Sequence, residues 1–189
     1  MNPLLWRLAA LWFLNAVCAY TFGFWAPQIL KTVAGLRNTQ VGFASAVLTL
    51  ISVPFMLGWT AHSDRRGERR LHIALGELVL AFGFLGTAFL HNPRLAIAAQ
   101  AVIWIGINIQ NGPFWSLPGS LLSGTAAAGG IALISSVAFT GGFVGPSAFG
   151  HISDASRGYN VGLTLLAALA LTASGIASTV RTVAPNQAS

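Results

Sequence analysis

Charged residues are the scarcest class in this sequence. Asp, Glu, Lys and Arg make up 7% of its 189 residues, whereas a soluble globular domain carries about 25%. The mean hydropathy of +0.70 is correspondingly high. A soluble chain of this length could not cover so much apolar surface with so few polar groups. The composition therefore excludes an ordinary soluble domain.

Cysteine is almost missing as well, because the chain contains a single one, Cys18, inside an apolar segment. One thiol cannot form a disulfide or a cysteine-based metal cluster within the chain. The formal net charge of +6 would indicate nucleic-acid binding in a soluble protein. In so apolar a chain it is typical of loops that set membrane topology. We expect no metal, no cofactor and no nucleic-acid partner.

Long apolar runs, by contrast, fill most of the sequence. Each approaches or exceeds about 20 residues, the length of helix that crosses roughly 30 Å of hydrocarbon. A membrane β-barrel would instead show alternating segments of about 10 residues. The sequence predicts an all-α membrane protein, a single six-helix domain over residues 1–189 in a lipid bilayer. The expected spans are residues 4–27, 39–60, 71–90, 95–115, 126–151 and 161–180.

The few basic residues divide unequally between the two ends of these spans. Six spans place both termini on one side, together with the segment HSDRRGERR at residues 62–70. Because basic loops stay in the cytoplasm, we expect an inner-membrane protein with both termini cytoplasmic. The basic residues on this face are Arg7, Arg65, Arg66, Arg69, Arg70 and Arg181, and those on the other are Lys31, Arg37, Arg94 and Arg157.

The charged segment with its flank, GWTAHSDRRGERR at residues 58–70, resembles the Gly-x-x-x-Asp-Arg-x-Gly-Arg-Arg loop of the major facilitator superfamily, with extra spacing before Asp64. The resemblance implies a cytoplasmic latch. In such a latch a carboxylate at a helix end pairs with an Arg and with the positive N-terminus of a neighbouring helix. The alternative is a solvated loop that only sets orientation. The matching residues are Gly58, Asp64, Arg65, Gly67, Arg69 and Arg70.

Other stretches are similar to one branch of that superfamily, the anion:cation symporters. They are FGFWAPQILK (22–31), GLRNTQVGF (35–43), GPFWSLP (112–118), GTAAAGGIALISS (124–136) and GGFVGP (141–146). The resemblance covers nearly all of residues 4–181 and corresponds to the C-terminal six-helix half of such a carrier. It implies secondary active transport of a small organic anion, a carboxylate or sugar acid, by cation-coupled symport.

The fourth expected span carries a polar and aromatic stripe. Trp104, Asn108, Asn111 and Trp115 are spaced four, three and four residues apart, which places them on one face of a continuous helix. Amide N–H donors between aromatic walls suit a small carboxylate or hydroxy acid. Alternatively, the amides join neighbouring helices and Trp115 lies at the membrane interface.

The resemblance adds residues of the first and fifth spans to this candidate site. It places Tyr20 at the cavity, and it places Ser135 and Phe139 where the family usually has Asn. These two replacements of Asn have two explanations. Either this chain carries a substrate that differs from the family's usual one or is more apolar, or selection on transport has lapsed. The expected substrate-binding residues are Tyr20, Asn108, Asn111, Trp115 and Ser135.

One acidic residue, Glu77, lies well inside an expected span. A carboxyl group within a membrane is costly and is by default a candidate functional site, here a candidate proton site. Glu77 is also about two turns from the cytoplasmic end, within reach of Arg70. The resemblance places the coupling carboxylates in the other half of the carrier.

A six-helix half exposes its cavity face, which is unfavourable in lipid. We expect a separate N-terminal half or a second copy of the chain to cover it. The alternative is an inactive remnant or a structural membrane partner without transport activity. Met1 falls where the second half of the family begins, which favours a split or interrupted carrier. We do not expect an enzyme. TASG at residues 172–175 resembles the nucleophile loop of an intramembrane serine protease, but that chemistry needs a histidine on a later span, and no histidine follows in the sequence.

Overall fold

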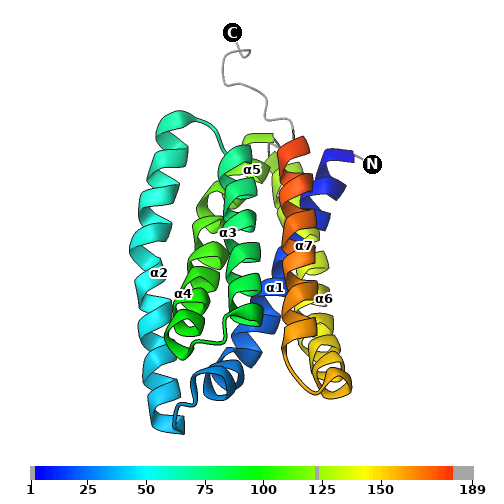
Figure 1. Cartoon of the computed structure of the whole chain (residues 1–189). Helices are drawn as coiled ribbons and strands as arrows, with labels where there is room; N and C mark the ends of the chain where they lie inside the picture. The colour runs from blue at the N-terminus through cyan, green and yellow to red at the C-terminus, as the bar shows by residue number, and fades with distance from the viewer. Residues whose placement is uncertain (1–2, 122–123, 181–189) are drawn as a thin grey trace.

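The computed structural model describes residues 3–121 and 124–180, and every regular element in this part of the chain is an α-helix (Figure 1). The expected all-α fold is confirmed. Arg181 lies outside the described residues. The helices are α1 (Pro3–Ala34), α2 (Asn38–Arg66), α3 (Arg70–Phe89), α4 (Pro93–Ile109), α5 (Asn111–Leu121), α6 (Gly124–Ser156) and α7 (Asn160–Thr179).

Within the described residues, six helical segments are long and apolar enough to cross a membrane. The short helices α4 and α5 together supply one of them, Pro93–Gly119. Helix α1 has 32 residues, about 48 Å at 1.5 Å per residue, so it extends beyond the hydrocarbon layer. The chain is a multi-pass membrane protein, as expected.

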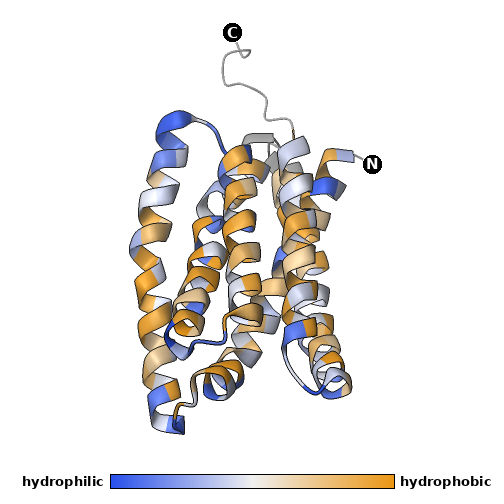
Figure 2. Cartoon of the chain, viewed as in Figure 1, coloured by the Kyte–Doolittle hydropathy of each residue, from blue (hydrophilic) through white to orange (hydrophobic). Residues whose placement is uncertain are grey.

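The polar residues gather at the two ends of the bundle. Figure 2 shows hydrophilic residues at the turns between helices and hydrophobic residues along the helical shafts. The loop between α2 and α3 lies at the same end as the start of α1 and the end of α7, and the loops after α1, α3 and α6 lie at the opposite end (Figure 1). This division separates the Arg-rich segment at residues 62–70 from Lys31, Arg37, Arg94 and Arg157.

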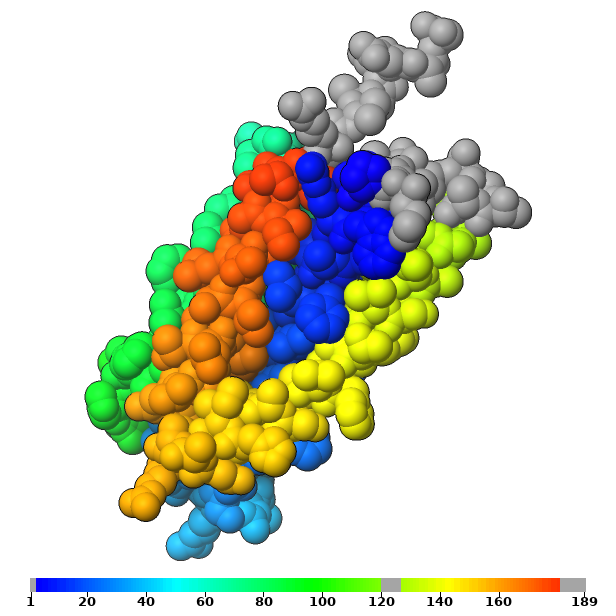
Figure 3. Space-filling view, turned by 90° about the vertical axis from the view of Figure 1, so that its right-hand side faces the viewer, coloured from blue at the N-terminus to red at the C-terminus, as the bar shows by residue number. Residues whose placement is uncertain are grey.

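Helix α1 runs through the bundle and packs on α4, α6 and α7. In Figure 3 it lies between α7 and α6 over much of the visible face. A Cβ atom at Gly142 of α6 would lie 2.9 Å from the Tyr20 ring, and one at Gly141 would lie 3.0 Å from the Phe13 ring. These glycines let α6 approach α1 closely, as small residues do between membrane helices.

Helices α3 and α4 meet in the same way. A Cβ atom at Gly106 would lie 2.6 Å from the backbone nitrogen of Leu80, and one at Gly83 would lie 2.8 Å from that of Ile103. Leu80 and Ile103 are both fully buried. Helix α2 packs mainly on α4 and is otherwise peripheral, since few of its residues are buried.

Candidate functional site

A cavity of about 320 Å³ opens between α1, α5 and α6. Its walls are mostly apolar, with a small number of polar side chains among aromatic rings, which is the usual make-up of a small-molecule site. Its lining residues are Trp12, Asn15, Ala16, Ala19, Tyr20, Ile107, Asn111, Trp115, Ser135, Ala138 and Phe139.

Most of the predicted substrate-binding residues lie around this cavity. Tyr20 comes from α1, Asn111 and Trp115 from α5, and Ser135 from α6. Phe139 lies one helical turn beyond Ser135, and its ring is 6.4 Å from the Tyr20 ring in an edge-on arrangement. Residues more than 100 positions apart in sequence thus share one small space.

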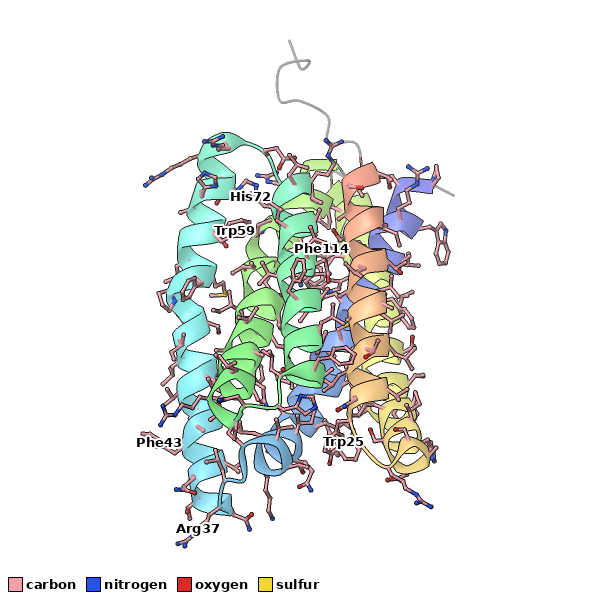
Figure 4. All side chains as sticks on the ribbon, viewed as in Figure 1. Trp25, Arg37, Phe43, Trp59, His72 and Phe114 are labelled. Atoms are coloured by element: carbon pink, nitrogen blue, oxygen red, sulfur yellow. The ribbon has the colours of Figure 1, made fainter. Side chains whose placement is uncertain are left out.

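Trp115 is held in place by two other aromatic rings. Trp12 and Phe114 stack at a centroid distance of 3.8 Å, and the Trp115 ring stands edge-on to both, at 5.3 and 5.2 Å. Phe114, labelled in Figure 4, is fully buried in the bundle. Such edge-on contacts fix ring orientation, so Trp115 presents a defined surface to the cavity.

Asn108 is not among the residues that line the cavity, and the fourth span is interrupted close to it. Helix α4 ends at Ile109 and α5 begins at Asn111. Pro113 has no N–H to donate to Ile109, which removes one helical hydrogen bond at this point. Asn108 turns to α2, where its Nδ2 donates to Ser52 Oγ at 3.1 Å. The Gly112–Pro113 pair was the sequence signal for this break.

The amide of Asn111 offers the cavity an acceptor rather than the donor expected from the sequence. Its Nδ2 donates to the carbonyl oxygens of Ile107 at 3.0 Å and Asn108 at 3.4 Å. With both of its N–H groups engaged, Oδ1 is the atom left for a ligand.

Hydrogen-bond donors for a ligand come from other residues around the cavity. Within the described part of the chain, no partner engages the hydroxyls of Tyr20 and Ser135 or the indole N–H of Trp115. The cavity therefore offers these donors together with the amide oxygen of Asn111 as an acceptor. Neither Lys nor Arg is among its lining residues.

Glu77 lies behind this cavity rather than against Arg70. It is fully buried, and its Oε1 accepts a hydrogen bond from Nδ2 of Asn15 at 3.3 Å. Asn15 itself lines the cavity. One side chain therefore separates the buried carboxyl group from the space between α1, α5 and α6.

The predicted latch residues surround the turn between α2 and α3. Gly67 ends α2 in the left-handed conformation, with φ of 63°, and its N–H donates to the Asp64 carbonyl at 3.2 Å. Asp64 is exposed, and among the described residues its carboxylate takes part in no ion pair. Gly58 lies in α2 with open space beside it, Arg65 is exposed, and Arg70 is the first residue of α3.

The acidic residue at the start of α3 is Glu68, which the sequence analysis did not single out. Both of its carboxylate oxygens accept from the backbone N–H of Leu71, at 3.0 and 2.9 Å. A carboxylate at this position stabilises a helix N-terminus. The signal was available in the sequence, since Glu68 comes directly before an apolar run and acidic residues are typical of helix N-termini.

A pair of histidines joins α2 to α3 beside this cap. His62 Nδ1 lies 2.8 Å from His72 Nε2, and His72 Nδ1 lies 3.3 Å from Glu68 Oε2. The indole N–H of Trp59 donates to the backbone carbonyl of His72 at 3.2 Å, and both side chains are labelled in Figure 4. Ten residues separate the two histidines, so helical periodicity could not pair them.

Arg69 connects the charged loop to the cavity helix. Its guanidinium donates to the backbone carbonyl of Ser116 at 3.4 Å. Ser116 follows Trp115 directly in α5. The turn between α2 and α3 is thereby tied to the helix that carries two of the cavity residues.

Comparison with known proteins identifies the family of the chain. The family model described as Major Facilitator Superfamily matches residues 1–146. A putative tartrate transporter of Agrobacterium vitis is 41% identical over 164 residues, which make up 87% of this chain and 36% of that protein. A second putative tartrate transporter of the same organism is 38% identical over 178 residues, or 94% of this chain and 41% of that protein.

A relative with a different name matches nearly the whole chain. The inner membrane transport protein RhmT of Escherichia coli (strain K12) is 36% identical over 184 residues, which cover 95% of this chain and 42% of that protein. The chain thus spans about two fifths of the length of these curated relatives. Since the family model covers well over half of its residues, the chain belongs to the major facilitator superfamily.

Proposed function

We propose that this chain forms one side of a transport pathway for a small hydroxylated organic acid such as tartrate, moved in symport with a cation. The observation that carries the proposal is the cavity between α1, α5 and α6, whose donors and acceptor are arranged among aromatic walls. Two relatives named as putative tartrate transporters support the choice of substrate class.

The polar groups suit both parts of such a substrate. A hydroxyl group of the acid would donate to Asn111 Oδ1, and a carboxylate would accept from the indole N–H of Trp115 and the hydroxyls of Tyr20 and Ser135. Each such hydrogen bond contributes about 1 kcal/mol, somewhat more with a charged acceptor. The cavity volume of about 320 Å³ is at the small end of the range for ligand sites.

A bound organic anion would need a positive charge beside it, which indicates a partner for this half. Among the described residues, no basic side chain lines the cavity, and a buried anion requires a compensating cation. We propose that a separate six-helix half, or a second copy of this chain, faces α1, α5 and α6 and supplies that charge. Substrate would then bind between the halves and alternate between the two sides of the membrane.

The turn between α2 and α3 would act as the cytoplasmic latch of that carrier. Asp64 is exposed and has no ion pair among the described residues, so it is available to an opposing half. Arg69, bound to the carbonyl of Ser116, would transmit the state of the latch to α5. The latch residues remain Gly58, Asp64, Arg65, Gly67, Arg69 and Arg70.

Uptake of radiolabelled tartrate tests the proposal. The chain is expressed with the segment of the Agrobacterium vitis relative that it does not match, and membrane vesicles are assayed under an imposed ion gradient. We expect uptake above that of either part alone, and Trp115→Ala to weaken apparent affinity about 10-fold, equivalent to 1.4 kcal/mol. Trp6→Ala is the matched control, because Trp6 is exposed outside the cavity. Uptake no greater than in empty vesicles would overturn the proposal.

A further inference from the structure

A buried cluster of one carboxyl group and two amides lies where α1, α3 and α4 meet. Glu77 of α3 is fully buried and accepts from Asn15 of α1, and the side chain of Gln110, after α4, lies beside the same carboxyl group. The helices are close here, since a Cβ atom at Gly76 would lie 3.2 Å from Cβ of Gln110.

Among the described residues, no basic group pairs with Glu77, and the one ion pair joins His72 and Glu68. The titratable group that faces Glu77 from α1 is the thiol of Cys18, which donates to the Leu166 carbonyl. Gln110 and Ser174 of α7, which donates to the Ala74 carbonyl, are neutral. An ionised carboxylate in this position would be a buried charge without a counterion, which is strongly unfavourable.

The unsatisfied atoms of the cluster indicate where a proton belongs. Glu77 Oε2 and Gln110 Oε1 are both buried without a hydrogen-bond partner. Gln110 is oriented by its own Nε2, which donates to the Gly106 carbonyl at 3.0 Å. Two acceptors without a donor are costly in a protein interior. A proton on Glu77 Oε2 would remove the uncompensated charge and would turn this acceptor into a donor for the neighbouring Gln110 side chain.

We propose that Glu77 is a proton-binding site, a neutral carboxylic acid that donates from Oε2 to Gln110 and accepts from Asn15, and that this proton is the coupling ion of the proposed symport. The second part rests on the proposed function. Asn15 gives the physical link, because it lines the cavity and also donates to Glu77. Loss of the proton would place a buried negative charge directly on the hydrogen-bond partner of Asn15, so the protonation state of Glu77 acts on a side chain that also lines the cavity.

Infrared spectroscopy of the purified chain tests the protonation directly. The chain has four Asp and Glu residues, so the carbonyl band of one protonated carboxylic acid can be resolved at pH 7. We expect this band in the wild type, its loss in Glu77→Gln, and its retention in the control Glu68→Gln. Its frequency should shift in Asn15→Ala but not in Asn111→Ala, because Asn111 lines the cavity without touching Glu77. The absence of a protonated carboxyl band, or a band unchanged by Glu77→Gln, would overturn the proposal.

Two further measurements distinguish a failure of folding, a failure of the coupling role and a failure of the proposed function. Circular dichroism checks that Glu77→Gln retains its helices, and if it does not, the frequency shift in Asn15→Ala decides the assignment. In the vesicle assay, Glu77→Gln should abolish the stimulation of tartrate uptake by a pH gradient. Equal stimulation in the variant and the wild type would overturn the coupling role. If the wild type itself takes up no tartrate, the proposed function fails, while the infrared band still decides whether Glu77 holds a proton.

Discussion

At the scale of single residues, two asparagines three positions apart make different contacts. Asn111 lines the cavity, and its Oδ1 is left for a ligand because its N–H groups donate to backbone carbonyls. Asn108 donates to Ser52 of α2 and lies outside the cavity lining. A polar side chain within a span can therefore serve either a ligand or a helix contact, and its position in the sequence does not distinguish them.

This difference predicts opposite consequences for one substitution at the two sites. Asn111→Leu should weaken tartrate binding about 5-fold, since a lost hydrogen bond is worth about 1 kcal/mol. Asn108→Leu should leave binding unchanged and lower thermal stability by a similar energy, because it removes the contact with Ser52. Equilibrium binding and thermal unfolding of both variants check this pair. Equal loss of binding in both would contradict the assignment.

Close helix contacts determine the architecture at the scale of elements. Gly106 and Gly83 bring α4 and α3 together until the position of a Cβ atom is occupied by the backbone of the facing helix. Backbone atoms cannot move aside as a flexible side chain can. The sequence shows these glycines, but only the packing shows which of them are indispensable.

Gly106→Ala should therefore destabilise the bundle by about 1–3 kcal/mol, the usual cost of forcing extra volume into a packed interior. Gly23→Ala is the matched control, because the same atom at Gly23 meets nothing within 4 Å and alanine favours a helix. Thermal unfolding of the two variants in detergent provides the measurement. The prediction fails if they unfold at the same temperature.

The turn between α2 and α3 gives a second prediction at this scale. Asp64→Asn should lower the rate of tartrate uptake about 5-fold or more without reducing membrane insertion. This is the smallest effect expected when a coupling contact of a conformational switch is lost, since such contacts are typically worth about 1 kcal/mol or more. Its control is Arg66→Gln, which removes an exposed charge next to the same loop but outside the latch. Initial rates and the amount of inserted protein would be measured together. Unchanged rates in Asp64→Asn would remove the latch role.

The whole molecule separates its charged loops into two groups at opposite ends of the bundle (Figure 1). The Arg-rich turn at residues 62–70 lies at the end where α1 begins and α7 ends. We propose that this end is cytoplasmic, because positive loops are retained there. Arg66 and Arg94 are both exposed and lie at opposite ends.

Labelling with a membrane-impermeant maleimide tests this orientation in whole cells. The buried Cys18 is first replaced by Ala, and Arg66→Cys and Arg94→Cys are then made separately. We expect Arg94→Cys to react in intact cells and Arg66→Cys to react only after permeabilisation. The reverse pattern would place the Arg-rich turn outside.

The sequence by itself determined the class of the protein and its family. Scarcity of charge and the length of the apolar runs suffice for a six-span helical membrane protein, because both follow from the thickness and polarity of the bilayer. The resemblance of GWTAHSDRRGERR to a known loop pointed to the major facilitator superfamily, which the comparisons confirmed. These features are compositional or local, so no knowledge of packing was required.

Only the tertiary structure decided which side chains meet. Asn15 and Glu77 lie 62 residues apart in sequence, and their contact depends on how α1 rotates against α3. Asn108 contacts Ser52 of α2, whereas Asn111 lines the cavity, and these different neighbours follow from how the surrounding helices pack. Helical periodicity places residues on one face of one helix, but the rotation of each helix is set by its contacts with others.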